Sequence, residues 1–402
     1  MTPQELRASA SLALIFALRM LGLFMVLPVF ALEAAKYPGG DDAARVGLAM
    51  GLYGLTQAVC QLPLGMASDR WGRKRVIVVG LLVFALGSVV AALASTLDGL
   101  MLGRALQGAG AVSAAVTALM ADLTRDGVRT KAMAMVGGSI GLMFALALVI
   151  SPLLAAWVGL SGIFGLTCAL ALVGVAVVLW VVPPEPAQAA DAPRGHPREL
   201  LRHPDLLRLN LGVFVLHTVQ MAMWVAVPAL LVAGGLLKAA HWQVYLPAVA
   251  LSLVAMGALF ALERRGQLRL ALLGSIALVG VVQLGLAGVA AVQAAPSLWL
   301  MGLLMLLFFI GFNALEASQP SLVSRMAPPH LRGAALGAYN TLQSLGLFAG
   351  GVLGGVVLAW GGMVGLFVAT AGLMALWLLV TWPLQPVGRN STAAADAEAV
   401  QK

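Results

Sequence analysis

Long apolar runs recur along almost the whole chain and are separated by short polar segments. The hydrocarbon core of a bilayer is about 30 Å thick, and a helix of about 20 apolar residues crosses it. Charged residues make up 10% of the 402-residue chain, against about 25% in ordinary soluble domains. Because a helix pairs all of its own backbone polar groups in lipid, the pattern predicts an all-α membrane protein.

Twelve of these runs are predicted to be transmembrane helices, which leaves few residues for other structure. They cover residues 11–32, 46–67, 76–95, 99–121, 132–156, 161–182, 209–233, 243–262, 268–292, 297–321, 333–359 and 363–384. The first run is longer than the apolar region of a typical signal peptide and contains Arg19, so we predict a retained helix.

A polar, proline-rich break divides the chain into two halves of similar length. We predict a six-helix bundle over residues 1–182, a cytoplasmic linker over 183–205 and a second six-helix bundle over 206–388. Residues 389–402 are polar and rich in alanine, and we expect them to be a disordered tail.

The basic residues indicate the orientation of the chain in the membrane. Nineteen of the 24 Lys and Arg residues fall in loops and ends on one face, whereas the opposite face keeps only Lys36, Arg45 and Lys238. Cytoplasmic loops are enriched in Lys and Arg, so both termini are predicted to be cytoplasmic. The net charge of +8 therefore reports orientation and contact with anionic lipid, and we expect no nucleic-acid partner.

Five charged residues crowd the turn between the second and third runs, in the sequence Gly65-Met-Ala-Ser-Asp-Arg-Trp-Gly-Arg-Lys-Arg75. Their spacing and their place in the topology resemble motif A of the major facilitator superfamily. The stretch 103–110 around Arg104 resembles motif B of the same superfamily. At a finer level the chain is similar to the YajR-type branch, through residues 18–28, 52–59, 102–110, 122–125 and 312–316.

This resemblance implies two six-helix bundles that rock about a central site near the bilayer midplane, in a bacterial inner membrane. It implies proton-coupled export of small amphipathic or cationic compounds by alternating access. YajR-type proteins often carry a further C-terminal soluble domain, which we expect this chain to lack.

The resemblance also implies a conformational latch at motif A. Asp69, Arg73 and Asp122 would form a charge relay that holds the bundles together on the cytoplasmic side and favours the outward-open state. The other members of the motif are Gly65, Arg70, Gly72, Lys74 and Arg75.

Polar residues inside the predicted helices are candidates for the transport chemistry, because each is costly in hydrocarbon. Glu316 and His217 are predicted to bind and release the proton, and Arg104 and Arg19 to tune them. A purely structural reading stays open: Arg104 could pin helices through backbone carbonyls, and His217 could bond to a neighbouring helix. The predicted substrate contacts are Tyr53, Gln57, Gln107, Asn313 and Gln343.

One motif of drug–proton antiporters is altered, which leaves other kinds of transport open. Ser151 replaces the glycine that usually precedes the proline of the fifth helix, Pro152. Proton-coupled uptake or uniport of a metabolite is therefore an alternative, and a non-transporting membrane sensor is a remote one. We expect no enzyme activity, no metal and no cofactor beyond a proton gradient as the driving force. A small-molecule substrate and a monomer are expected.

Overall fold

The structure is a computed structural model that describes residues 1–185, 197–265, 267–292, 295–328 and 331–384. Helices account for nearly all of this part of the chain. They are α1 (Pro3–Val26), α2 (Phe30–Ala34), α3 (Ala43–Trp71), α4 (Arg73–Ala92), α5 (Leu97–Ala109), α6 (Ser113–Asp122), α7 (Asp126–Trp180), η1 (Pro197–Arg202), α8 (Pro204–Ala233), η2 (Lys238–Ala240), α9 (Trp242–Arg264), α10 (Leu268–Ala291), α11 (Leu298–Met326) and α12 (Arg332–Thr381). Residues 186–196 of the predicted linker and the predicted tail, 389–402, lie outside the described residues.

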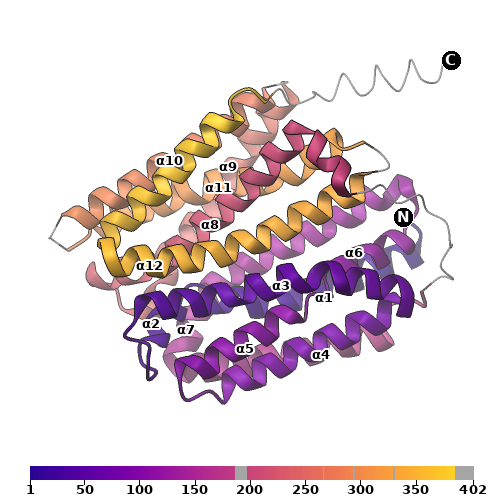
Figure 1. The fold of residues 1–402 in the computed structure, drawn as a ribbon, viewed down its shortest axis with the longest axis horizontal. Coiled ribbons are helices and arrows are strands. Elements are labelled where there is room, and N and C mark those ends of the chain that lie inside the picture. The colour runs from indigo at the N-terminus through magenta and orange to yellow at the C-terminus, as the bar shows by residue number, and fades with distance from the viewer. Residues whose placement is uncertain (186–196, 266, 293–294, 329–330, 385–402) are drawn as a thin grey trace.

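Within the described residues, eight helices are long and apolar enough to cross a membrane. Two of them, α7 and α12, are 55 and 50 residues long. A straight helix of that length would extend about 75 Å or more, far beyond a hydrocarbon core of about 30 Å. Each is interrupted by a glycine at φ +62°, Gly159 in α7 and Gly362 in α12, and Figure 1 shows α12 doubling back. The count of twelve crossings stays a prediction.

The predicted helix over residues 99–121 is interrupted in the structure. The helix α5 ends at Ala109, and α6 begins at Ser113. Two glycines in this region allow other backbones to approach closely. A Cβ added to Gly108 would lie 2.1 Å from the carbonyl oxygen of Tyr53, and a Cβ added to Gly110 would lie 2.4 Å from the carbonyl oxygen of Gly80. The interruption therefore lies where α3 and α4 press against this segment.

The loops of the N-terminal half gather at two ends of the molecule. At one end the Arg7 side chain donates to the Val181 carbonyl at 3.0 Å, and Lys74 donates to the Val182 carbonyl at 2.6 Å. We call this the basic end; it holds the N-terminus, the 71–74 turn and the α6–α7 connection (Figure 1). At the opposite end the Leu97 amide donates to the Pro38 carbonyl at 3.1 Å.

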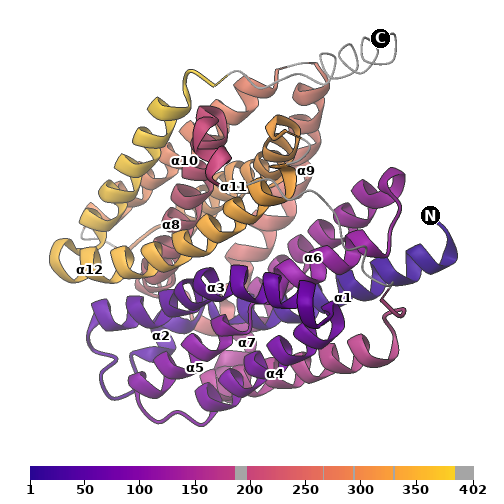
Figure 2. The ribbon, with the colours of Figure 1, turned by 45° about the vertical axis from the view of Figure 1, so that its right-hand side comes forward.

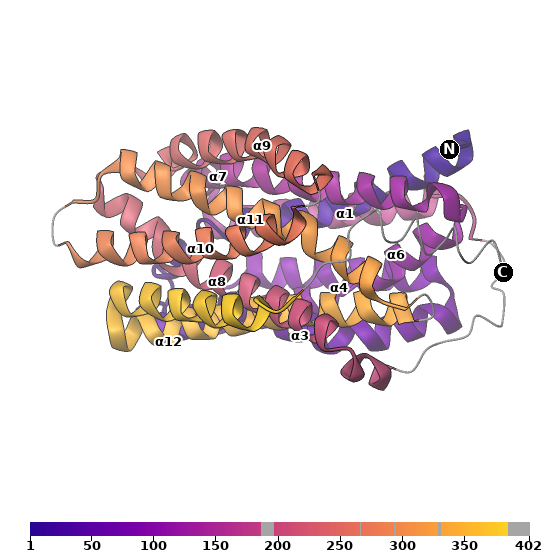
Figure 3. The same cartoon turned by 90° about the horizontal axis from the view of Figure 1, so that it is seen from above.

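Helices α1–α7 and α8–α12 form two groups that meet along α3 and α12 (Figure 2). Near the opposite end the two backbones touch, and an added Cβ on Gly351 would lie 2.5 Å from the Gly47 carbonyl oxygen. Gly350, one residue earlier, faces α8 instead, with a Cβ position 2.3 Å from the Thr218 carbonyl oxygen. Figure 2 shows the two groups diverging toward the basic end, and Figure 3 shows a further contact where α7 passes α9.

Candidate functional site

The first buried polar cluster is built around Arg19, in the C-terminal half of α1. Its side chain is 1% exposed, and it donates to the Tyr53 hydroxyl at 2.8 Å, the Ser113 hydroxyl at 3.0 Å and the Gln57 carbonyl oxygen at 3.3 Å. These three partners come from α3 and α6. All three are neutral, so they satisfy the hydrogen bonds of Arg19 without cancelling its charge.

Arg104 on α5 adds a second buried guanidinium to this cluster. It is also 1% exposed, and its guanidinium carbon lies 4.9 Å from the ring centre of Tyr53. It donates to the Gln107 carbonyl oxygen at 2.9 Å, and the amide of Gln107 donates to Ser88 at 2.9 Å. The contacts of Arg104 described here are therefore with the side chains of Gln107 and Tyr53. Both of these residues were predicted to contact substrate, and in the structure they are buried partners of the two arginines.

Neither arginine of this cluster is neutralised by an acid in the part of the chain that the structure describes. The carboxylates there that form ion pairs have other partners, and the Nε atoms of both arginines have no hydrogen-bond partner. Burying an unpaired charge is costly, and a cation over an aromatic ring recovers only part of that cost. We call Arg19, Arg104 and Tyr53, with their partners Gln57 and Ser113, the arginine cluster.

The second buried cluster joins three helices of the C-terminal half. Nε2 of His217 on α8 lies 3.1 Å from a carboxylate oxygen of Glu316 on α11, and 2.8 Å from the amide nitrogen of Gln343 on α12. The other ring nitrogen lies 2.9 Å from the Val213 carbonyl, which accepts a hydrogen bond from Nδ1–H. His217 is buried, whereas the Glu316 side chain is 31% exposed.

This geometry gives His217 two alternative partners that depend on its protonation. With Nδ1–H bonded to Val213, a neutral ring has a lone pair on Nε2 that accepts a hydrogen bond from the Gln343 amide. A protonated ring has a hydrogen on Nε2, which donates to the Glu316 carboxylate. In the predicted proton-binding role of His217, protonation would exchange the contact with Gln343 on α12 for an ion pair with Glu316 on α11. We call these three residues the histidine cluster.

Two adjacent residues of α12 link the clusters across the two groups of helices. The Gln57 amide donates to the Ser344 hydroxyl at 2.9 Å, and Ser344 directly follows Gln343. The sequence analysis missed Ser344, because a serine in an apolar helix gives little signal. Of the remaining predicted substrate contact residues, Asn313 is half-buried and donates to Ser252 on α9 at 2.9 Å.

Aromatic side chains also bridge the two groups of helices near these clusters. The ring of Phe144 on α7 lies 5.1 Å from Phe24 on α1, and 6.0 Å from Phe309 on α11. Phe312, one turn further along α11, lies 6.1 Å from the His217 ring. Apolar, polarisable surface therefore adjoins the histidine cluster.

Motif A brings its predicted charges together at the basic end. Arg73 forms an ion pair with Asp69, lies 3.2 Å from an Asp122 oxygen, and donates to the Ser68 hydroxyl at 2.8 Å. These contacts join α3, α4 and α6, all in the N-terminal half. The joining of the two halves by this relay stays a prediction.

The glycines of motif A differ in their roles. Gly72 turns the chain at φ +95°, where an added Cβ would lie 2.7 Å from a carboxylate oxygen of Glu185. Glu185 in turn accepts from the Lys74 amide at 3.2 Å. At Gly65 an added Cβ would make ordinary contact with α6, at 3.4 Å from the Ala114 side chain. Arg70 and Arg75 are exposed.

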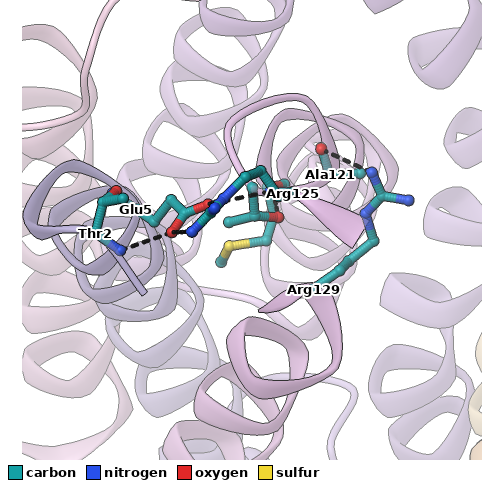
Figure 4. A network of polar contacts seen from close by, with 7 residues as sticks. Thr2, Glu5, Ala121, Arg125 and Arg129 are labelled. Carbon is teal, nitrogen blue, oxygen red and sulfur yellow. Dashed lines mark hydrogen bonds and ion pairs between the residues drawn. The ribbon is translucent and has the colours of Figure 1, made fainter. Parts of the chain in front are cut away.

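A separate network lies beside motif A at the basic end (Figure 4). Thr2 and Glu5 form a capping box at the start of α1, and Glu5 accepts from the Arg125 side chain at 2.7 Å. Arg129 donates to the Ala121 carbonyl at 3.1 Å. The Thr-x-x-Glu spacing predicts such a cap, although the sequence analysis did not use it. A cavity of about 460 Å³ borders this network, lined by Thr2, Gln4, Glu5, Asp122, Leu123, Pro184 and Glu185, away from the two buried clusters.

At the opposite end an ion pair connects the two groups of helices. The carboxylate of Glu33 on α2 pairs with Lys238 on η2 and with Lys36, whose nitrogen lies 2.9 Å away. The Glu33 side chain is 4% exposed and that of Lys238 is 22% exposed. This contact joins the two groups of helices at the opposite end in the observed conformation, and nothing in the sequence placed these two residues together.

Two groups of membrane-crossing helices that enclose buried polar clusters define a secondary transporter. The comparisons identify the family. The sequence pattern of the Major Facilitator Superfamily matches residues 12–351, and the chain belongs to this family.

Named relatives agree with this assignment. The chain is 42% identical over 388 residues to the inner membrane transport protein YajR of Escherichia coli (strain K12), covering 94% of this chain and 84% of that protein. It is 27% identical over 404 residues to the class G tetracycline resistance protein of Vibrio anguillarum, covering 93% and 94%. The crystal structure of a D-xylose–proton symporter shares the fold, with a TM-score of 0.74 at 15% identity over 95% of this chain and 98% of that one. The candidate membrane helices and the YajR relative support a bacterial inner-membrane location.

Proposed function

We propose that this protein exports small amphipathic compounds in exchange for protons, as a monomer driven by the proton gradient. The histidine cluster carries the proposal. Glu316 and His217 lie 3.1 Å apart, and they exchange partners when the ring gains a proton. A carboxylate and an imidazole within membrane helices are costly, and such residues characteristically mark ion, proton or substrate pathways.

The relatives support export over uptake. A tetracycline resistance protein matches nearly the whole chain, and resistance is consistent with outward transport. The aromatic bridge supports amphipathic compounds, because rings offer a large apolar contact area.

Alternating access then requires a closing contact at each end of the molecule. In the proposed cycle, the Glu33–Lys238 ion pair and the α3–α12 glycine contact close the opposite end. The Asp69–Arg73–Asp122 relay, whose three residues already pair in the observed conformation, would gain a partner in the C-terminal half and so close the basic end in the outward-open state, as the family resemblance implies. Both termini face the cytoplasm in this proposal, because the basic end holds the excess of Lys and Arg.

The proposal is tested in everted membrane vesicles with a pH-sensitive dye and a panel of amphipathic compounds. The expected result is compound-induced proton release that is lost in Glu316→Gln. Asp98→Asn is the matched control, because the Asp98 side chain is 74% exposed and lies at the opposite end. Proton release that persists in Glu316→Gln would reject the histidine cluster as the proton site, and no response to any compound would reject antiport.

A further inference from the structure

The arginine cluster holds two buried positive charges that no acid neutralises within the described residues. We propose that Arg19 binds the carboxylate of an amphipathic organic acid, so that the exported compounds are organic anions. This inference rests on the proposed export function and narrows its substrate class.

The first argument is electrostatic. Arg19 and Arg104 are each 1% exposed, and both approach the same residue: Arg19 through the Tyr53 hydroxyl, Arg104 through the Tyr53 ring. Two like charges gathered around one side chain repel each other, and low-dielectric surroundings strengthen the repulsion. An anion bound here relieves that repulsion and replaces part of the hydration that both guanidiniums lost. A cation bound at the same place would add a third positive charge.

The second argument concerns hydrogen bonding. A guanidinium presents donors in a planar fork that matches the two oxygens of a carboxylate. The terminal nitrogens of Arg19 instead donate hydrogen bonds to neutral oxygens, and its Nε has no hydrogen-bond partner. A carboxylate would make shorter and stronger bonds than these neutral acceptors do.

The third argument concerns access. Tyr53 is 1% exposed, whereas Gln57 and Ser113 are half-buried, so the ligand is proposed to approach Arg19 from the side of these two residues. The Gln57 contact is the longest of the three at 3.3 Å, and it is the one that a carboxylate oxygen would replace. Displaced from Arg19, the Gln57 side chain keeps its amide bond to Ser344 in the C-terminal half.

Arg104 is better placed to supply charge than to contact the ligand. It lies over the Tyr53 ring and bonds to Gln107, which is itself 1% exposed and held by the fully buried Ser88. The carboxylate is therefore assigned to Arg19. The apolar body of the ligand is assigned to the aromatic bridge, which begins at Phe24 on the same helix.

The test uses the full chain in lipid nanodiscs, without a proton gradient, and isothermal titration calorimetry. Three probes share one ring system: naphthoate, neutral naphthamide and cationic naphthylmethylamine. Chloride is a fourth probe, because a small inorganic anion offers charge without an apolar body. We expect naphthoate to bind at least about tenfold more tightly than the amide and the amine, the factor that one charge-assisted hydrogen bond provides. Equal binding of the three ring probes, preference for the amine, or displacement of naphthoate by millimolar chloride would overturn the proposal.

Three variants assign the binding to Arg19. Arg19→Gln is expected to weaken naphthoate binding at least about tenfold and to leave naphthamide binding unchanged. Arg19→Lys keeps the charge and loses the fork, so a smaller loss is expected. Arg45→Gln is the matched control, because Arg45 pairs with Asp98 at the opposite end and is 41% exposed. Equal loss of acid and amide binding in Arg19→Gln would show a structural pin instead.

Gln57→Ala keeps the inference testable if the Arg19 variants fail to fold. It removes the neutral acceptor that competes with the carboxylate, so naphthoate should bind equally or more tightly; weaker binding would contradict the proposal. The outcome is also independent of the antiport proposal. Acid binding without proton release in vesicles would keep this inference and reject antiport, whereas proton release with amines alone would do the reverse.

Discussion

Replacement of Gly351 by alanine tests whether the α3–α12 contact controls the conformational equilibrium. The added methyl would lie 2.5 Å from the Gly47 carbonyl oxygen, and 2.7 and 2.8 Å from the Gly51 nitrogen and Cα. All three are backbone atoms, so no side chain can rotate away. The two helices must separate at the opposite end, or the conformation in which they touch must lose population.

The size of the effect follows from the cost of overpacking. Forcing extra atoms into a close-packed interface costs about 1–3 kcal/mol. A conformation with α3 and α12 apart at this end does not bear that cost. Since 1.4 kcal/mol is a factor of ten in an equilibrium constant, Gly351→Ala should shift the ratio of open to closed opposite ends by about 5- to 150-fold.

Distances between spin labels measure this shift directly. Labels at Asp41 and Trp360 report the opposite end, after Cys60 and Cys168 are replaced by alanine. The long-distance population should grow in Gly351→Ala. The matched control is Gly372→Ala, on the same helix element, where an added Cβ meets nothing within 4 Å. An unchanged distance distribution in Gly351→Ala, or an equal change in both variants, would refute the reasoning.

Two further substitutions test the contacts at the two ends. Asp69→Asn removes the charge that pairs with Arg73 and should lower transport severalfold at equal membrane insertion. Transport is measured as vesicle flux per inserted protein, and a flux equal to that of the wild type would contradict the latch role. Lys238→Gln leaves Glu33 paired with Lys36 alone, so the loss of stability should be less than the about 3–5 kcal/mol that breaking a buried ion pair costs. The same substitution should lengthen the spin-label distances at the opposite end. Unchanged distances in this variant would show that the ion pair does not hold the opposite end closed.

The sequence is sufficient to predict the helical membrane class and the family, because hydrocarbon imposes a length and composition on every crossing. It also indicates which polar residues matter, since each charge inside an apolar run is costly and therefore conspicuous. The family and the fold class are confirmed, and Glu316 and His217 do lie side by side. The proton-binding role of that pair stays a proposal.

The sequence could not predict contacts that depend on how the two groups of helices meet. The Gln57–Ser344 and Glu33–Lys238 pairs each join residues more than two hundred positions apart. Neither pair follows from helical periodicity, because periodicity identifies which face of a helix is apolar but does not identify the helix that packs against that face. The interruption near Gly110 was missed for a similar reason: its cause is the close approach of Gly80, on another helix.

The position of Gln343 and Ser344 shows how the two clusters can be coupled. Gln343 bonds to His217 only while the ring nitrogen Nε2 is free to accept, and Ser344 bonds to Gln57 beside Arg19. On these proposals, a proton on His217 removes the contact with Gln343 on α12, and an anion on Arg19 displaces Gln57, the residue bonded to Ser344 at the next position of α12. In these proposals the proton acts on Gln343 and the anion acts on Gln57, the partner of Ser344, so both ligands act beside adjacent residues of the helix whose glycines touch α3 at the opposite end. A helix placed in this way provides a physical path by which proton and substrate binding bias one conformational equilibrium, since each ligand changes contacts that differ between its states.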